Sequence, residues 1–188
     1  TNPCSEIILR PNQFCNLTEV VVRPDDTEDM LHNKIEVATI LGTIQSTLTD
    51  FGYLRKRWQK NTEEERLLGV SLTGIMDNSL LSRMRTKLPE VLQNMRQKAV
   101  IVNEEWSKKL GIPQSTAITC VKPSGTVSQL VDSASGIHAR HNPYYIRTVR
   151  GDKKDPLTIF MAEQGIPCED DVMQPNNSVF SFPMKADP

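Results

Sequence analysis

The chain opens with TNPCSEIILRPNQFC (residues 1–15), and this segment determines the architecture that we expect. An amide, a thiol and a carboxylate stand two residues apart in it, at Asn2, Cys4 and Glu6. If the segment is extended, these three side chains project to one side. Such a row favours thiol and acid–base chemistry on a small polyhydroxylated substrate over packing in a core. The alternative is a polar terminal strand with one incidental cysteine.

Composition limits the classes of function. The 188 residues are 38% hydrophobic and 24% charged, which is typical of a globular chain with one sizeable core. The net charge is −1, with 22 basic and 23 acidic residues, so we expect no polynucleotide partner and relate any nucleic-acid link to a mononucleotide. No long apolar run or signal peptide is present, so we expect no membrane partner and a cytoplasmic location.

Cysteine usage points to a reducing compartment. The chain has 4 cysteines, which are too few and too scattered for a secreted disulfide framework. A zinc site is an alternative, but its spacings are unusual for zinc ligands, so we expect no metal; its ligands would be Cys4, Cys15, His138 and His141. We interpret both histidines as surface loop residues, and Cys120 and Cys168 as inert.

The expected elements alternate between strand and helix. Residues 6–9 and 14–22 are rich in apolar and β-branched residues and flank a turn, which predicts a hairpin with Cys15 opposite Ile8. Residues 25–28 resemble a cap, which predicts a helix over 27–51. A strand and glycine turn are expected over 67–75. A helix is expected over 88–110, with stop signals at 111–113.

A second polar segment follows an expected strand at residues 116–121. Its KPSGT turn (122–126) leads into an expected short helix, and its glycine and hydroxyls suit a phosphate group. It is not a Walker A loop, and an N-capped turn is the alternative. The candidate phosphate-binding residues are Pro123, Ser124, Gly125, Thr126, Val127 and Ser128. We interpret Tyr144 and Tyr145 as strand packing, and the basic cluster at 55–57 as solvated surface or, alternatively, a phosphate contact.

Three ordered blocks carry a resemblance to a known family. NPCSEI (2–7) with FCNLTEV (14–20) resembles the active-site loop of ribonucleotide reductases, most closely the monomeric, adenosylcobalamin-dependent (class II) ribonucleoside-triphosphate reductases. CVKPSGTVSQL (120–130) with SGIHARH (135–141) is similar to the family's substrate-phosphate loop. ERLLGVSLTGIMD (65–77) is similar to a further stretch of the same subclass. The likeness weakens after about residue 150.

The resemblance implies a role for each residue of the opening segment. Cys4 matches the cysteine that becomes a thiyl radical and removes the 3′-hydrogen of the ribose. Glu6 matches the carboxylate that takes the 3′-hydroxyl proton, and Asn2 matches the amide that binds the sugar. Cys15 matches one half of a redox-active dithiol whose other half lies earlier in the family's chain. The implied cofactor is adenosylcobalamin, and the implied partners are a ribonucleoside triphosphate, a thioredoxin-type reductant and the rest of the reductase chain.

The expected fold class is α/β with parallel strands. The resemblance implies a ten-stranded α/β barrel with a central active-site finger loop, of which residues 1–188 form a part, as a fragment of a longer chain. Two alternatives stay open: a diphosphate-specific or subunit-activated (class I) reductase, and a non-catalytic piece that complements another chain. The resemblance also implies that an acidic residue usually takes the position of Gly125 in class I, so Gly125 followed by Thr126, Val127 and Ser128 argues against that class.

Overall fold

The computed structural model describes residues 1–83 and 86–186. The chain divides into two compact units, Thr1–Ala139 and Arg140–Pro188, and each is described by itself. Among the described residues, no helix has the length and apolar character needed to cross a membrane.

A parallel pair of strands forms the centre of the first unit. Strand β1 (Asn16–Val21) pairs with β2 (Leu68–Thr73) in register from Asn16 opposite Leu68. A parallel bridge between Val70 and Thr119 adds the expected third strand segment on the other side of β2. Because parallel strands need a crossover, the chain passes through helices between them, which confirms α/β architecture in this unit.

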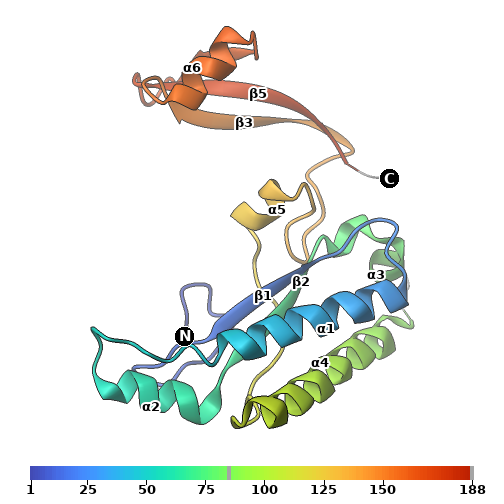
Figure 1. Cartoon of the computed structure of the whole chain (residues 1–188). Coiled ribbons are helices and arrows are strands. Elements are labelled where there is room, and N and C mark those ends of the chain that lie inside the picture. The colour runs from blue at the N-terminus through green and yellow to red at the C-terminus, as the bar shows by residue number, and fades with distance from the viewer. Residues whose placement is uncertain (84–85, 187–188) are drawn as a thin grey trace. The chain divides into compact units, whose positions relative to one another are not determined.

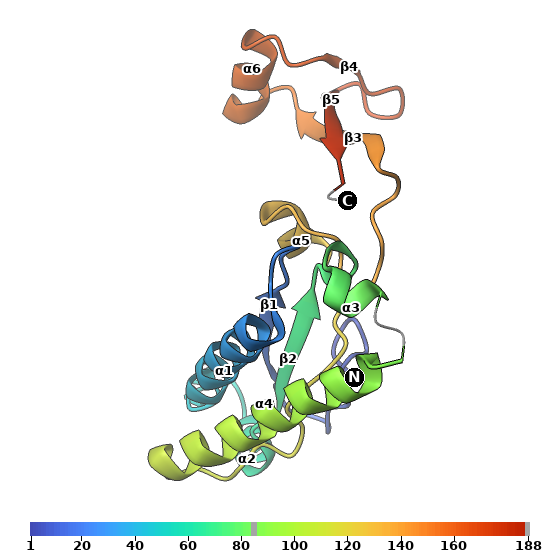
Figure 2. The same cartoon turned by 90° about the vertical axis from the view of Figure 1, so that its right-hand side faces the viewer.

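Two long helices, α1 (Glu28–Gln45) and α4 (Leu88–Leu110), lie side by side against one face of this sheet (Figures 1 and 2). Leu31, Ile35 and Ala38 of α1 and Met95 and Ala99 of α4 enter the apolar core between the layers. The sheet contributes Val20, Leu68 and Val70 to the same core, and Val22, directly after β1, joins them. The helices therefore fix which face of β1 and β2 is closed and which remains for a site.

The helix boundaries follow local chemistry. Thr27, within the predicted capping segment 25–28, caps α1, because its hydroxyl accepts a hydrogen bond from Met30 N at 3.3 Å. The predicted helix over 27–51 is too long, because the hydroxyls of Ser46 and Thr47 bond to carbonyls of the last turn and compete with helix propagation. The prediction for α4 is confirmed, and Gly111 ends this helix with φ at 67°.

Helix α2 (Lys56–Glu65) was not predicted, and it contains most of the basic cluster. It buries only Thr62, so its sequence lacks the apolar periodicity that reveals a helix. Shorter elements complete the first unit: a 3-10 turn η1 (Ile75–Asp77), α3 (Ser79–Arg83) and the expected short helix α5 (Thr126–Leu130).

The predicted hairpin over residues 6–22 is wrong. Residues 5–9 form no strand, and β1 pairs with the distant β2 instead. The opening segment folds on itself: Asn2 N donates to Ile7 O at 3.3 Å, and Ile7 N donates to the side-chain oxygen of Asn2 at 3.2 Å. Ser5 takes a left-handed φ of 61° in this loop. Asn2, Cys4 and Glu6 are therefore not arranged along one face of a strand.

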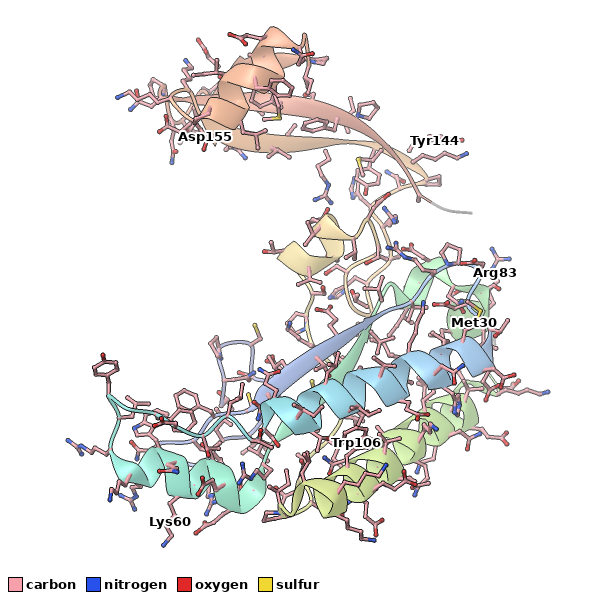
Figure 3. The ribbon with its side chains drawn as sticks, in the orientation of Figure 1. Met30, Lys60, Arg83, Trp106, Tyr144 and Asp155 are labelled. Carbon is pink, nitrogen blue, oxygen red and sulfur yellow. The ribbon has the colours of Figure 1, made fainter. Side chains whose placement is uncertain are left out.

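The second unit is an antiparallel sheet, which corrects the expectation of parallel strands throughout. Its order is β3 (Tyr144–Asp152), β5 (Asn177–Lys185), β4 (Cys168–Asp170). Helix α6 (Pro156–Glu163) begins after Asp155, whose carboxylate accepts from Leu157 N at 2.8 Å (Figure 3). Phe180 of β5 is fully buried. Tyr144 and Tyr145 lie in a strand, as predicted.

Candidate active site

The opening loop (residues 1–9) presents its thiol and its carboxylate differently. Cys4 lies in the exposed turn, whereas Glu6 is half-buried and Ile7 is buried. The amide oxygen of Asn2 is used inside the loop, where it holds Ile7 N. Glu6 Oε2 is buried and accepts no hydrogen bond from any residue in the described part of the chain. The loop thus combines an accessible thiol with a carboxylate oxygen that has unused acceptor capacity.

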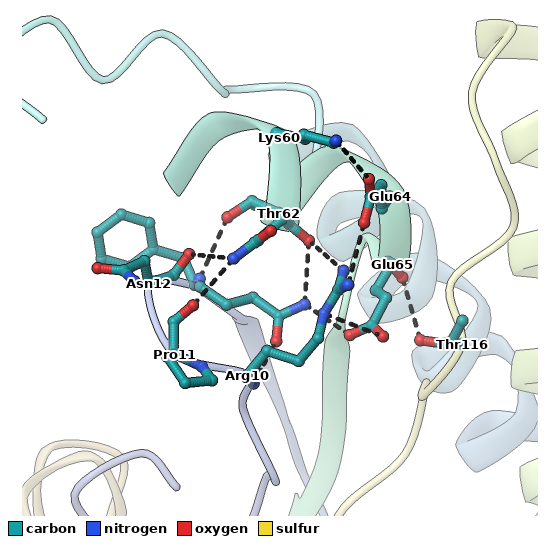
Figure 4. A network of polar contacts seen from close by, with 11 residues as sticks. Arg10, Pro11, Asn12, Lys60, Thr62, Glu64, Glu65 and Thr116 are labelled. Atoms are coloured by element: carbon teal, nitrogen blue, oxygen red, sulfur yellow. Dashed lines mark hydrogen bonds and ion pairs between the residues drawn. The ribbon is translucent and has the colours of Figure 1, made fainter. Parts of the chain in front are cut away.

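A polar network fixes the segment that follows this loop (Figure 4). Gln13, 3% exposed, accepts from Arg10 N at 2.7 Å and donates to Asn61 O at 3.1 Å and to Glu65 at 2.6 Å. The Arg10 guanidinium reaches Glu64 at 3.0 Å and Glu65 at 3.3 Å. Because the three acceptors lie on α2, that helix sets the position from which the chain enters Cys15 and β1.

The sheet face that points away from the helices carries the site. Thr18 faces α1, because a Cβ built on Gly42 of that helix would lie 3.5 Å from the methyl carbon of Thr18. Leu17 and Glu19 therefore project to the opposite face, together with Cys15 if the strand geometry continues one residue back. We call this surface of β1, β2 and residues 117–121 the inner face.

Gly69 lets three segments meet on the inner face. A Cβ on Gly69 would lie 2.7 Å from Ile7 Cδ1 of the opening loop and 3.0 Å from Cys120 Sγ. A side chain at this position would force Ile7 to shift and would crowd the Cys120 sulfur, so glycine favours this close approach. The arrangement brings Cys120 beside the opening loop. Cys120 was predicted to be inert, and its nonlocal position was not visible in the sequence.

Burial controls the two thiols of the inner face. Burial and, next, the nearby Glu6 carboxylate raise the pKa of the Cys15 thiol. Burial, with smaller contributions from Glu6 and Cys15, raises the pKa of Cys120 to about 11. Both groups are therefore protonated at neutral pH. They are suited to donate hydrogen and poorly suited to act as thiolate nucleophiles.

The predicted phosphate loop uses two of its hydroxyls internally. Ser128, fully buried, donates its hydroxyl to Ser124 O at 2.7 Å, and its amide donates to Ser124 Oγ at 3.2 Å. Gly125, Thr126 and Val127 are exposed at the turn, as is Pro123. The groups available to a ligand here are those of residues 125–127, and Ser124 and Ser128 shape the turn.

A strap at residues 133–136 clamps this loop and was not anticipated. The Ser135 hydroxyl donates to Ser124 O. Thr73, fully buried at the end of β2, donates to Ala134 O at 3.1 Å and accepts from Gly136 N at 2.8 Å. Asp77 accepts from Ala134 N at 2.6 Å. Nothing in the local sequence of Thr73 indicates this contact.

The zinc alternative named Cys4, Cys15, His138 and His141 as ligands. Within residues 1–83 and 86–186, no group of three or more His, Cys, Asp or Glu side chains could hold a metal ion. His138 and His141 are exposed loop residues, as predicted. Cys168 is exposed in β4 of the second unit.

The chain is similar to proteins of one class, the B12-dependent (class II) ribonucleotide reductases. A crystal structure of a B12-dependent (class II) ribonucleotide reductase matches with a TM-score of 0.82 and 27% sequence identity, covering 99% of this chain and 29% of that one. Two curated proteins named adenosylcobalamin-dependent ribonucleoside-triphosphate reductase also match. The one from Lactobacillus acidophilus is 30% identical over 210 residues and the one from Lactobacillus leichmannii 29% over 211 residues.

The resemblance predicted from the sequence is therefore confirmed: almost the whole chain is similar to one segment of these reductases. Each alignment with the two curated relatives covers 99% of this chain and 28% of the relative's length. No family model matches the chain.

Proposed function

We propose that this chain is the active-site segment of an adenosylcobalamin-dependent ribonucleoside-triphosphate reductase, an oxidoreductase that makes 2′-deoxyribonucleoside triphosphates for DNA synthesis. One observation carries the proposal: the opening loop and the residue before the phosphate loop both meet the inner face, Ile7 at Gly69 and Lys122 at Glu19. Cys15, just before β1, and Glu19 are four residues apart, about 13 Å at ~3.3 Å per residue. A ribonucleotide bridges such a span with its sugar at one end and its phosphates at the other.

Cys4 would start the chemistry. Adenosylcobalamin, when bound, supplies the radical chemistry that removes the thiol hydrogen. The thiol of Cys4 is exposed, so a radical-forming cofactor can reach it. We assign no described side chain of this chain to cofactor binding. The Cys4 thiyl then takes the 3′-hydrogen of the ribose, which reforms the S–H bond and leaves the unpaired electron on C3′.

Glu6 and Cys15 would complete the reduction. The free oxygen of Glu6 accepts the 3′-hydroxyl proton while the 2′-hydroxyl leaves as water. Cys15 and a second thiol together give two electrons and two protons and become a disulfide. Glu6 then returns its proton to the 3′-oxygen, and Cys4 returns its hydrogen to C3′ and becomes a thiyl again. Ribonucleotide and two thiols thus yield deoxyribonucleotide, water and disulfide. The raised pKa of Cys15 suits this role, because the thiol keeps its hydrogen until the reaction needs it.

The surroundings of the segment follow from the same proposal. A thioredoxin-type dithiol in the cytoplasm would reduce the disulfide after each turnover. Residues 1–188 would form part of a ten-stranded α/β barrel whose central finger is the opening loop. The exposed turn at 125–127 would bind the substrate phosphates through backbone N–H groups and the Thr126 hydroxyl.

Substitution of Cys4 tests the proposal in the complete reductase. Cys4→Ala should abolish deoxynucleotide formation and leave the nucleotide dissociation constant within about twofold, because only the radical site is removed. Cys168→Ala, an exposed cysteine of the second unit, is the matched control and should keep its turnover. Deoxynucleotide would be quantified by chromatography after a timed reaction. Substantial turnover by Cys4→Ala would refute the radical role.

A further inference from the structure

Glu19 and Lys122 form a charged pair that the proposed chemistry does not use. Glu19 lies in β1, and its side chain is only 8% exposed. One of its oxygens, Oε2, lies 3.5 Å from the Lys122 ammonium nitrogen. The other, Oε1, is buried and accepts no hydrogen bond from any side chain or amide in the described part of the chain.

The ion pair between Glu19 and Lys122 leaves hydrogen-bonding capacity unused. Charge-assisted hydrogen bonds between ammonium and carboxylate are usually about 2.7–2.9 Å long, so a 3.5 Å contact is loose. A buried carboxylate oxygen without a partner is costly unless something else satisfies it. Glu19 therefore offers an acceptor, and Lys122 offers hydrogen-bond donors that Glu19 does not use.

The location of the pair suits a ligand that carries both an anionic group and a hydroxyl group. Lys122 directly precedes the phosphate loop and is the one lysine or arginine in the sequence between residues 121 and 137. Glu19 lies on the inner face with Cys120, and the charges of Glu6, Glu19 and Lys122 all act on the Cys120 thiol. The pair thus adjoins the phosphate loop in sequence and lies near the same thiol as the carboxylate of the opening loop.

We propose that Glu19 and Lys122 are a two-point contact for a phosphorylated sugar: Lys122 binds a phosphate oxygen, and the free oxygen of Glu19 accepts a hydrogen bond from a ribose hydroxyl. This rests on the proposed function, because it presumes a ribonucleotide on the inner face. A ligand with both an anion and a hydroxyl donor satisfies both members of the pair. A deoxyribonucleotide that lacks the matching hydroxyl leaves a buried carboxylate oxygen unpaired.

The test measures dissociation constants in the complete reductase by isothermal titration. The ligands are a ribonucleoside triphosphate, its 2′-deoxy and 3′-deoxy analogues and the unphosphorylated ribonucleoside. Glu19→Gln should raise the dissociation constant of the ribonucleoside triphosphate by about tenfold. It should change the dissociation constant of one of the two deoxy analogues by no more than about twofold. Lys122→Met should raise the dissociation constant of every triphosphate by about tenfold and that of the nucleoside by no more than about twofold.

Matched controls come from an exposed ion pair of the same type on α4. Lys108 and Glu104 lie 2.6 Å apart, and both side chains are largely exposed. Glu104→Gln and Lys108→Met should leave all four dissociation constants unchanged. Thermal unfolding of each variant separates a lost contact from a lost fold. If Glu19→Gln does not fold, the Lys122→Met comparison of triphosphate with nucleoside still decides the phosphate contact.

The outcomes separate this inference from the proposed function. An equal penalty from Glu19→Gln on all four ligands would overturn the sugar contact, and an equal penalty from Lys122→Met on triphosphate and nucleoside would overturn the phosphate contact. In both cases a wild-type protein that still reduces ribonucleotides leaves the proposed function standing. A wild-type protein that binds no nucleotide would refute both.

Discussion

Burial keeps two thiols of the inner face protonated at neutral pH, and this determines how they can react. Cys15 and Cys120 are both partly buried, and the carboxylate of Glu6 adds to the effect on each. A protonated thiol holds a hydrogen that a radical reaction can use, and it resists alkylation and unwanted disulfide exchange. The environment of the site therefore favours hydrogen donation by these residues.

The pH dependence of alkylation tests this at Cys120. Its reaction with iodoacetamide should stay slow at pH 8 and rise only as the pH approaches 11, because its pKa is raised from 9.0 to about 11. Peptide mass spectrometry would measure the rate, with the exposed Cys168 as the internal control. Equal rates for the two cysteines at pH 8 would contradict the prediction.

The same shift has a consequence for stability. The folded protein binds this proton more tightly than the unfolded chain, so the stabilisation is complete below pH 9.0 and is lost as the pH rises to about 11. Cys120→Ser should remove this part of the pH dependence of the free energy of unfolding. A thermal unfolding series between pH 8 and 11 would compare the two proteins.

At the scale of elements, helix α2 holds the base of the opening loop through Gln13. Gln13→Leu should lower the free energy of unfolding by about 2–4 kcal/mol, because three hydrogen bonds are lost and Glu65 loses a donor. Urea unfolding would measure it. Gln59→Leu on α2 is the control, since Gln59 is exposed and should change stability by no more than about 0.5 kcal/mol.

The alkylation rate of Cys15 shows whether Gln13 positions this thiol or only stabilises the fold. Because Gln13 fixes the segment leading into Cys15, its loss should speed alkylation of Cys15 under conditions where the protein stays folded. An unchanged alkylation rate in folded Gln13→Leu would show that the network stabilises α2 without controlling the thiol.

The strap at residues 133–136 makes β2 a support for the phosphate loop. Thr73→Val should lower the free energy of unfolding by about 1–3 kcal/mol, since Gly136 N loses its acceptor and Ala134 O loses a donor. It should also weaken nucleotide binding by about threefold or more in the complete reductase. Thr73→Ser keeps the hydroxyl and is the matched control. Loss of stability without any change in affinity would show that the strap does not shape the ligand site.

How far the sequence predicts each element depends on where its determinants lie. Helix α4 and the caps at Thr27 and Gly111 were predictable, because periodicity and capping are local properties. The hairpin prediction failed because residues 14–22 read as a strand whatever their partner, and β1 pairs with β2 about fifty residues later. The meeting of Ile7 and Cys120 over Gly69 is likewise nonlocal.

The candidate site shows the same division. The resemblance assigned roles to four residues, of which three lie in the opening loop and one directly precedes β1: Asn2, Cys4, Glu6 and Cys15. Glu19 and Gln13 were missed, although the alternation of β1 places Glu19 on the face of Cys15, a signal that was available once the strand was recognised. The support from Thr73 requires tertiary structure, since its partners are more than sixty residues away.

At the scale of the whole molecule, the first unit has a narrow sheet and an open apolar cavity. The described strands of this unit form a narrow parallel sheet, whereas parallel sheets are normally covered and continued on both sides. A mostly apolar cavity of about 350 Å³ opens beside β2 and α4, lined in part by Ile35, Leu72 and Met95. These features agree with a segment that spans about 28% of the length of its relatives.

The last prediction concerns the 188-residue chain produced alone. We expect it to form no deoxynucleotide, because the proposed dithiol needs a second thiol that the resemblance assigns to an earlier part of the family's chain. We also expect it to associate or to be poorly soluble, because strand edges that have no partner among the described residues and an open apolar cavity favour contacts between copies. Light scattering after size exclusion would give the mass. Incubation with adenosylcobalamin, a ribonucleoside triphosphate and dithiothreitol would test activity. A pure, soluble monomer that makes deoxynucleotide would show that these 188 residues contain every indispensable group.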